Sequence, residues 1–282
     1  MFSPCPCGGV SVNQCESQCW SVLTKDTAIC IRAVDYSETS QIVTFFTRAT
    51  GKISAIAKGS KRPKSAFDGP IEILSFGKIV FSDSTKEKLA TLTEFQQQAF
   101  STLSVNLFAF NCCLFAAELL NKLTHDYDPH PGLFDSFLQF LQHTVSLTGD
   151  VNEYRGSGIE HQQILSLLIL FQLTLLREIG LMPILNACAN CKTRYERRAT
   201  SDELYFSSSA NGLICRDCEA GFPEKIRLTR NAADCLANLK QITQSDEKTL
   251  NEIEQVLIYH FTELLGHRPK MAKHILKIQT GF

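Results

Sequence analysis

The sequence predicts an α+β protein in which a small all-β domain is followed by a mostly helical domain with an inserted four-cysteine module. Three observations predict this order. Five short runs rich in Ile, Val, Thr and Phe fall between residues 25 and 97. Beyond residue 100 the apolar residues recur every three and four positions, which is the helical period. Two Cys-x-x-Cys pairs then interrupt the helical pattern between residues 184 and 222.

Length and charge bound the function. A chain of 282 residues is typical of about two domains, and its net charge of −1 excludes a uniformly basic polyanion binder. The charge is segregated, however. Residues 25–95 hold 11 basic and 8 acidic residues, whereas residues 96–187 hold 3 basic and 8 acidic residues. This split predicts a nucleic-acid face at the N-terminal end and an acidic helical body behind it.

Residues 1–24 are expected to be a disordered extension, or to precede the true start of the protein. They lack the basic start and the apolar core of a secretory signal. Cys5, Cys7, Cys15 and Cys19 have spacings that suit zinc poorly, so we do not expect a second metal site there. Residues 25–97 are expected to form the barrel and residues 98–282 the helical domain.

The strands expected in the barrel are separated by turn signals rich in Gly, Ser, Asp and Pro. They are Thr27–Val34, Gln41–Thr47, Lys52–Ala57, Ile71–Phe81 and Leu89–Phe95. Five short strands in about 70 residues fit an OB-fold, a five-stranded Greek-key barrel that often binds single strands. An SH3-like barrel is the alternative at this level.

The stretch Thr39–Phe67 carries the strongest binding signal in the barrel. It has no acidic residue and six basic ones: Arg48, Lys52, Lys58, Lys61, Arg62 and Lys64. Cations at spaced positions on a rigid sheet and its adjoining loop suit the phosphates of a nucleic acid. The alternative is a solvated loop between strands.

Phe45 and Phe46 are adjacent in one expected strand and therefore point to opposite faces. One should fill the barrel. The other either lies exposed as a base-stacking platform or packs against the next domain, and we favour the packing role.

Helices are expected over Ser101–Leu123, Leu133–Leu147 with Pro131 at the first position, Ile159–Ile179, Asn231–Gln241 and Leu250–Leu265. Gly180 and Gly266 are the expected stops. A last helix is expected from His267 to Lys277, with a second basic patch. The strongest apolar run, Ile164–Leu176, has 13 residues. A membrane span needs about 20, so we expect a buried helix.

The four cysteines of the inserted module are the most specific local motif. Cys188 and Cys191 form one Cys-x-x-Cys pair, and Cys215 and Cys218 form the other. Four thiolates complete a tetrahedral Zn²⁺ shell with no open position, so the pattern predicts one structural zinc ion in a zinc ribbon. A redox Cys-x-x-Cys is the alternative, but the two matched pairs argue against it. Arg194, Arg197 and Arg198 between the pairs are balanced by nearby acids and are expected to be solvated.

No pattern in the sequence predicts bond-making catalysis. There is no Ser/His/Asp cluster, no phosphate-cradling glycine-rich loop and no paired carboxylates in a suitable setting. His125, Asp126, Asp128 and His130 lie close together, but a turn between helices is where polar residues are expected. We therefore predict a protein that is not an enzyme.

Three segments together resemble the bacterial RecO family. They are Asp35–Thr39 followed by IVTFFTRATGKISAIAKGSKRPKSAF, the knuckle FSSSANGLICRDC at Phe206–Cys218, and Tyr259-His260 with Leu265-Gly266 before the basic C-terminal residues. The resemblance covers about residues 25–280. It implies an OB-fold barrel, a helical body and a zinc module.

The resemblance also implies a function. RecO-like proteins bind single- and double-stranded DNA and anneal complementary strands. With RecR they help load RecA onto strands coated by the single-stranded-DNA-binding protein, whose acidic C-terminal tail they bind. Carried over, the six basic residues named above would contact DNA and the four cysteines would hold zinc, in a protein of the bacterial cytoplasm near the nucleoid, with no membrane partner. Two rivals stay open: an RNA-binding OB and zinc-ribbon protein of translation or transcription, and a protein-interaction scaffold.

Overall fold

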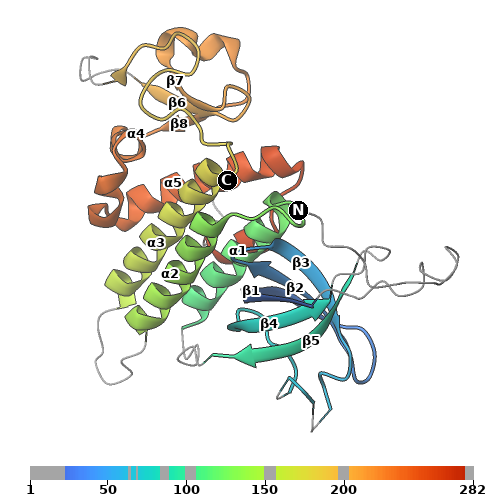
Figure 1. Cartoon of the computed structure of the whole chain (residues 1–282). Coiled ribbons are helices and arrows are strands. Elements are labelled where there is room, and N and C mark those ends of the chain that lie inside the picture. The colour runs from blue at the N-terminus through green and yellow to red at the C-terminus, as the bar shows by residue number, and fades with distance from the viewer. Residues whose placement is uncertain are drawn as a thin grey trace, which may run out of the picture.

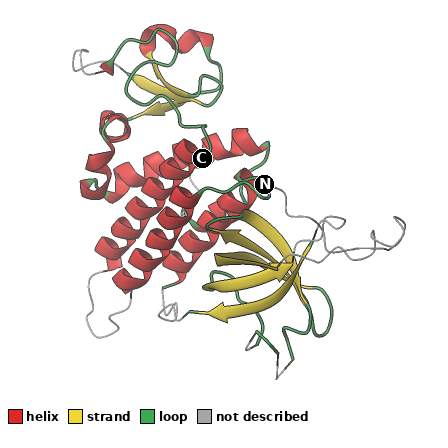
Figure 2. Cartoon of the chain, viewed as in Figure 1, coloured by secondary structure: helices red, strands yellow, loops and turns green. Residues whose placement is uncertain are grey.

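The computed structural model describes residues 23–62, 65–67, 69–82, 89–98, 106–148, 157–195 and 203–276. A helical body separates two all-β parts, a barrel formed by the N-terminal strands and a small three-stranded sheet (Figures 1 and 2). The barrel and the small sheet lie at opposite ends of the body. The predicted fold class is confirmed.

The N-terminal strands close into a barrel. Its strands are β1 (Leu23–Asp35), β2 (Gln41–Thr47), β3 (Gly51–Ala57), β4 (Phe76–Ser82) and β5 (Ala90–Gln97). They follow the order β1-β2-β3-β5-β4, and β1 also pairs with β4 to close the ring. The pairs are antiparallel except for β3 with β5. This ring has the order of an OB-type Greek-key barrel, which decides against the SH3-like alternative.

Two of the expected strand limits are wrong. Strand β1 begins at Leu23, because Leu23–Asp26 pair with β4. The segment from Ile71 to Ser75 is not a strand. There, Leu74 has a φ of +68° and is buried, with its N–H bonded to the Cys30 carbonyl. Burial of one apolar side chain thus overrides the local β-propensity of this run. The first 22 residues lie outside the described residues.

The body is built from α1 (Leu107–Leu123), α2 (Pro131–Thr148), α3 (Ser157–Glu178) and α5 (Glu247–Leu265). Helix α3 packs against the other three and buries Leu165, Leu168 and Leu176. By length and composition alone, its segment Ile159–Glu178 could cross a membrane, although the run seen in the sequence was shorter. Its packing against three helices identifies it as the core helix of the body.

The remaining elements connect the body to the small sheet. That sheet has the order β7-β6-β8, formed by β6 (Leu204–Ser207), β7 (Gly212–Cys215) and β8 (Ile226–Leu228). Helix α4 (Arg230–Ala237) is capped by Thr229 and ends before the expected Gln241, and the 3-10 turn η4 (Leu239–Gln244) follows. Two further 3-10 turns in the described residues are η3 (Arg216–Gly221) and η5 (Met271–His274).

The last predicted helix is wrong over its described part. Residues Met271–His274 form a single 3-10 turn. The carboxylate of Glu118 in α1 accepts hydrogen bonds from the N–H groups of Lys270 and Met271, at 2.8 Å each, and Ala272 is fully buried. These tertiary contacts fix the start of the turn on the body, which the local pattern could not predict.

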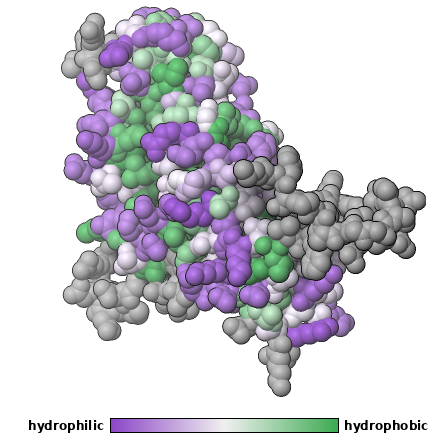
Figure 3. Space-filling model, viewed as in Figure 1, coloured by the Kyte–Doolittle hydropathy of each residue, from purple (hydrophilic) through white to green (hydrophobic). Residues whose placement is uncertain are grey.

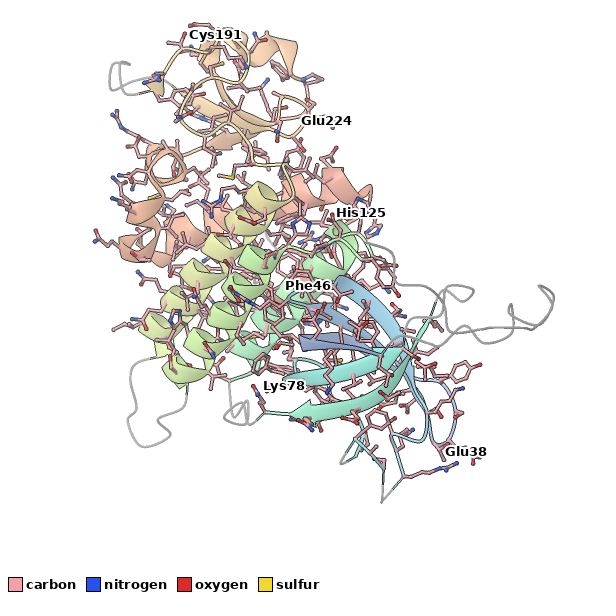
Figure 4. The ribbon with its side chains drawn as sticks, viewed as in Figure 1. Glu38, Phe46, Lys78, His125, Cys191 and Glu224 are labelled. Atoms are coloured by element: carbon pink, nitrogen blue, oxygen red, sulfur yellow. The ribbon has the colours of Figure 1, made fainter. Side chains whose placement is uncertain are left out.

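The two phenylalanines of β2 divide between two cores, as we favoured. Phe45 fills the barrel, where its ring lies 5.5 Å from that of Phe95. Phe46 is fully buried on the outer side, and its ring centroid lies 6.1 Å from that of Phe134 in α2. Figure 4 shows Phe46 at the boundary between the barrel and the helices. Neither ring is available to stack on a base.

A buried acid predicts how stability depends on pH. Burial raises the pKa of Glu254 in α5 to about 8, and a 2.8 Å hydrogen bond from Gln172 opposes this rise only partly. The native state therefore holds this proton over the range where the unfolded chain, with its ordinary value of 4.5, has lost it. Stability should fall as pH rises from the unfolded pKa to the folded one, by at most about 1.4 kcal/mol per pH unit, and level off above.

The measurement is urea unfolding across this range for the wild type and for Glu254→Gln, which keeps the shape but cannot ionise. The variant should lose the slope, and Glu263→Gln on the exposed face of the same helix should keep it. An unchanged slope in Glu254→Gln would assign the pH dependence to another group.

Candidate nucleic-acid interface and metal centre

The outer face of β1, β2 and β3 is divided along its length: Ile29, Ile31 and Phe46 are buried against the body, whereas the part that begins at Arg32 is not in that core. A register shift between Cys30 and Arg32 places a β-bulge in β1. Cys30 lies inside the barrel opposite Phe45, yet Arg32 pairs with Thr44 and is exposed. Simple alternation would have placed Arg32 inside with Cys30. Arg32 was therefore not among the predicted cations, because a bulge leaves no clear local signal in the sequence.

Beyond Arg32 the same face carries a row of apolar side chains. Val34 pairs with Ile42, and Ile42 pairs with Ile56 on the next strand. Val34 is 42% exposed, and Ile42 and Ile56 are half-buried. The face thus combines a cation with apolar groups, a combination that suits a ligand with both charged and flat apolar parts.

Two loops at the end of this face are joined by hydrogen bonds. The loop between β1 and β2 accepts from the loop after β3, through Lys61 N to Thr39 O at 3.1 Å and Gly59 N to Ser40 Oγ at 3.2 Å. The ammonium of Lys61 also lies 2.8 Å from a carboxylate oxygen of Asp35. The loops 36–40 and 58–62 therefore form one surface, which we call the loop tip.

The loop tip presents part of the predicted cation set. Lys58 and Arg62 are exposed and have no ion pair with a described residue. Lys61 is bound to Asp35, so its charge is partly neutralised. Lys64 lies outside the described residues. The structure therefore brings Lys58, Lys61 and Arg62 together on one short loop.

Lys52 has a different position. Its ammonium donates to the carbonyls of Asn121 and Thr124, at 2.9 and 2.6 Å, and lies 3.3 Å from Asp126. These carbonyls end helix α1, where a positive charge is favoured by the helix dipole and by unsatisfied acceptors. Only 12% of the Lys52 side chain is exposed. Its contacts join the barrel to the body and leave little charge for a ligand.

Arg48 also faces the body. Its guanidinium donates two hydrogen bonds to Asp135 of α2, at 2.9 and 2.8 Å, and this contact lowers the pKa of Asp135. Arg48 lies on the wall of a groove of about 870 Å³ between the barrel and the start of α2, together with Lys25 and Lys78. Asp26 and Glu94 line the same groove, so its charge is mixed. Figure 4 shows Lys78 well away from Glu38 of the loop tip.

The four predicted metal ligands meet at the far end of the molecule. The sulfur atoms of Cys188, Cys191, Cys215 and Cys218 all lie within 4.8 Å of one another. Cys191 and Cys215 are 3.8 Å apart, which is about the edge of a tetrahedron with metal–sulfur bonds of 2.3 Å, and too long for a disulfide. A hydrogen bond with Thr193 lowers the pKa of the Cys191 thiol to about 6. The donor set and its spacing can hold a metal ion.

Backbone contacts fix this module to the body. Gly212 has a φ of +156°, and a Cβ there would lie 2.4 Å from the carbonyl oxygen of Ile184, so the close approach of the two chains requires glycine. A side-chain contact adds to this, because Oγ of Ser208 in the module lies 2.8 Å from Nδ1 of the buried His260 in α5. Burial lowers the pKa of His260 to about 4, so the imidazole is neutral at pH 7.

The other polar groups noted in the sequence form no comparable site. Asp126 contacts Lys52, and Asp128 lies 3.3 Å from His130. Within the described ranges, the four cysteines are the one group of three or more potential ligands close enough to share an ion. Arg194 pairs with Ala187 in an isolated bridge, and Arg197 and Arg198 lie outside the described residues.

Comparison with known proteins identifies the family. The model for the recombination protein O N-terminal domain matches residues 22–99, and the model for the recombination protein O C-terminal domain matches residues 105–153 and 158–273. The chain belongs to the RecO family. A Bacillus pumilus protein named DNA repair protein RecO is 30% identical over 267 residues, covering 92% of this chain and 96% of that relative.

Further RecO relatives agree with this. One from Rhodopirellula baltica is 33% identical over 224 residues, covering 78% of this chain and 75% of the relative. One from Bacillus subtilis is 28% identical over 258 residues, covering 87% of this chain and 91% of the relative. Both carry the name DNA repair protein RecO. The RecO N-terminal match spans the barrel, and the C-terminal match spans the helical body with the cysteine module.

The position of Lys52 predicts that it acts on stability. Replacing it with Met removes the ammonium and leaves the carbonyls of Asn121 and Thr124 without a donor. We expect unfolding free energy to fall by about 1–3 kcal/mol. Urea unfolding measures this, with Lys58→Met as the matched control at an exposed site. Equal stability of the two variants would contradict a joining role for Lys52.

Proposed function

We propose that this RecO-family protein binds single- and double-stranded DNA, anneals complementary strands and, with RecR, helps load RecA during recombinational repair. The observation that supports it most is the loop tip, where exposed cations adjoin the outer barrel face. Family membership supports the role in repair. The protein acts by binding rather than by bond chemistry.

The proposed mechanism is electrostatic. Two DNA strands repel each other through their phosphates, and cations placed between them reduce that repulsion while the bases stay free to pair. Phosphate contacts carry no base information, so sequence specificity should be weak. Because the net charge of the chain is −1, binding depends on this local cluster and should weaken steeply with salt.

The contacts described above support a narrower set of residues that we propose to contact DNA. Lys58, Arg62 and Lys64 are the primary phosphate contacts, and Lys61 joins them by exchanging Asp35 for phosphate. Arg32 extends the surface along the sheet. We assign Arg48 and Lys52 to holding the barrel on the body, because their charges already meet Asp135 and the end of α1.

We also propose that Cys188, Cys191, Cys215 and Cys218 hold one structural Zn²⁺. The supporting observation is the closed set of four thiols with tetrahedral spacing. Such an ion supplies a fixed crosslink between the two knuckles. The cysteine module and the barrel lie at opposite ends of the body, so the ion would support the fold rather than touch DNA bound at the loop tip (Figure 1).

The proposed division of labour follows the expected domains. Residues 25–97 bind DNA, and residues 98–282, with the zinc module at 184–222, form the body that meets protein partners. We propose RecR and the C-terminal tail of the single-stranded-DNA-binding protein as those partners, with RecA acting downstream. The role in repair supports placing the protein in the bacterial cytoplasm, near the nucleoid.

Loss of the loop-tip cations tests the proposal. The triple variant with Lys58, Arg62 and Lys64 replaced by Ala should bind a single-stranded oligonucleotide about tenfold or more weakly at low salt. The slope of log K against log salt should become less negative by about 2, since each lost contact releases about 0.7 ions fewer. Fluorescence anisotropy gives both values, and an annealing assay should slow in parallel.

The control removes the same charge elsewhere. Lys122, Lys240 and Lys248 are exposed on the helical body, and their triple Ala variant should keep its affinity and salt slope. If both triple variants weaken equally, net charge rather than the loop tip governs binding. An RNA strand of equal length serves as a second probe, and a clear preference for it would favour an RNA-binding function.

Zinc binding has its own test. Purified protein should contain about one equivalent of zinc, and a strong chelator should lower its thermal stability. Replacing both Cys215 and Cys218 with Ser should abolish zinc binding and the effect of the chelator on thermal stability. Replacing Cys113 with Ser, as the control, should change neither the zinc content nor the effect of the chelator. Metal-free protein with four freely titratable thiols would contradict the assignment.

A further inference from the structure

Tyr36 is an exposed aromatic side chain with no role in the fold. It lies in the loop between β1 and β2 and is 64% exposed, the largest fraction of any aromatic side chain in the described parts of the chain. Its backbone N–H donates to Ser40 O at 3.0 Å, so the loop is ordered by its own backbone rather than by the ring. A single exposed ring is common on protein surfaces, so a ligand is inferred only from what lies around Tyr36.

The surroundings of Tyr36 indicate what kind of ligand fits. It follows the row of Val34, Ile42 and Ile56 on the outer sheet face, and its loop is bonded to the loop that carries Lys58 and Arg62. Flat apolar groups beside cations match the two parts of a nucleotide in a single strand, the base and the phosphate. In a duplex the faces of internal bases are covered by their neighbours.

The charges near the ring are mixed. Asp35 is paired with Lys61, and Glu38 is exposed in the same loop at the outer end of the barrel (Figure 4). The space-filling view likewise shows hydrophobic patches among hydrophilic residues over the barrel rather than a continuous polar surface (Figure 3). A purely electrostatic site would avoid both features, whereas a base-stacking site tolerates them, because stacking does not depend on net charge.

We propose that Tyr36 stacks on an unpaired nucleobase and gives the loop tip its preference for single strands. This rests on the proposed DNA-binding function and adds to it a contact that distinguishes unpaired bases from duplex. The phosphates of the same strand lie along Lys58 and Arg62, and the row of Val34, Ile42 and Ile56 supports the neighbouring base.

The test compares three substitutions on three probes. Tyr36→Phe keeps a ring, Tyr36→Leu keeps apolar bulk without a ring, and Tyr36→Ala removes both. The probes are an oligothymidylate, a strand of equal length lacking bases, and a blunt duplex. On oligothymidylate, the Leu and Ala variants should bind about fivefold or more weakly, and the Phe variant should stay within about twofold of wild type. On the other two probes all variants should match wild type.

Three results would overturn the inference. They are unchanged oligothymidylate binding by Tyr36→Ala, equal losses for Tyr36→Phe and Tyr36→Ala, and an equal loss on the strand without bases. Failure of the DNA-binding function looks different, since wild type itself would then bind none of the probes. Thermal unfolding of each variant checks that the loop change leaves the fold intact.

Discussion

The contact of Lys52 with the end of helix α1 fixes how the barrel sits on the body. Strand β3 approaches so closely that a Cβ at Gly51 would lie 2.3 Å from the carbonyl oxygen of Asp128, and Tyr127 N donates to Lys52 O at 2.9 Å. The buried ammonium then satisfies the last carbonyls of α1. A position with a φ of +84° and no room for a side chain can be filled by glycine alone. Backbone contacts and one buried charge therefore fix the position of this junction, beside the apolar packing of Phe46 against Phe134.

This junction separates the basic residues of the barrel into two kinds. Those at the β2–β3 turn, Arg48 and Lys52, meet carboxylates or carbonyls of the body. Those at the opposite end of the same two strands, Lys58 and Arg62, meet no described acid. The antiparallel register sets this division, because Thr47 pairs with Gly51 at one end and Gln41 with Ala57 at the other. Similar side chains thus brace the fold at one end of a hairpin and face solvent at the other.

The sequence predicted what depends on local pattern. The two Cys-x-x-Cys pairs and strands β2 and β3 could be found because spacing and alternation are local. Which distant residue a side chain contacts cannot be predicted from local pattern. Nothing in the sequence around Lys52 distinguishes it from Lys58, and nothing near Arg32 marks the bulge that turns it outward. Phe46 could be assigned to a second core only by assuming a second domain. Leu74 adopts a positive φ, and its side chain is buried in the core that the helical domain forms.

The same reasoning explains why the aromatic group at the interface had to be found in the structure. Alternation drew attention to Phe45 and Phe46, since strand residues carry a periodic signal, whereas Tyr36 lies in a loop with none. A strand aromatic on a small barrel is needed for packing, inside or against the neighbour, and both rings of β2 are used in this way. Tyr36, in contrast, is left exposed, in a loop that is bonded to the loop carrying Lys58 and Arg62. For this reason our proposal places the base contact on the loop rather than on the strand.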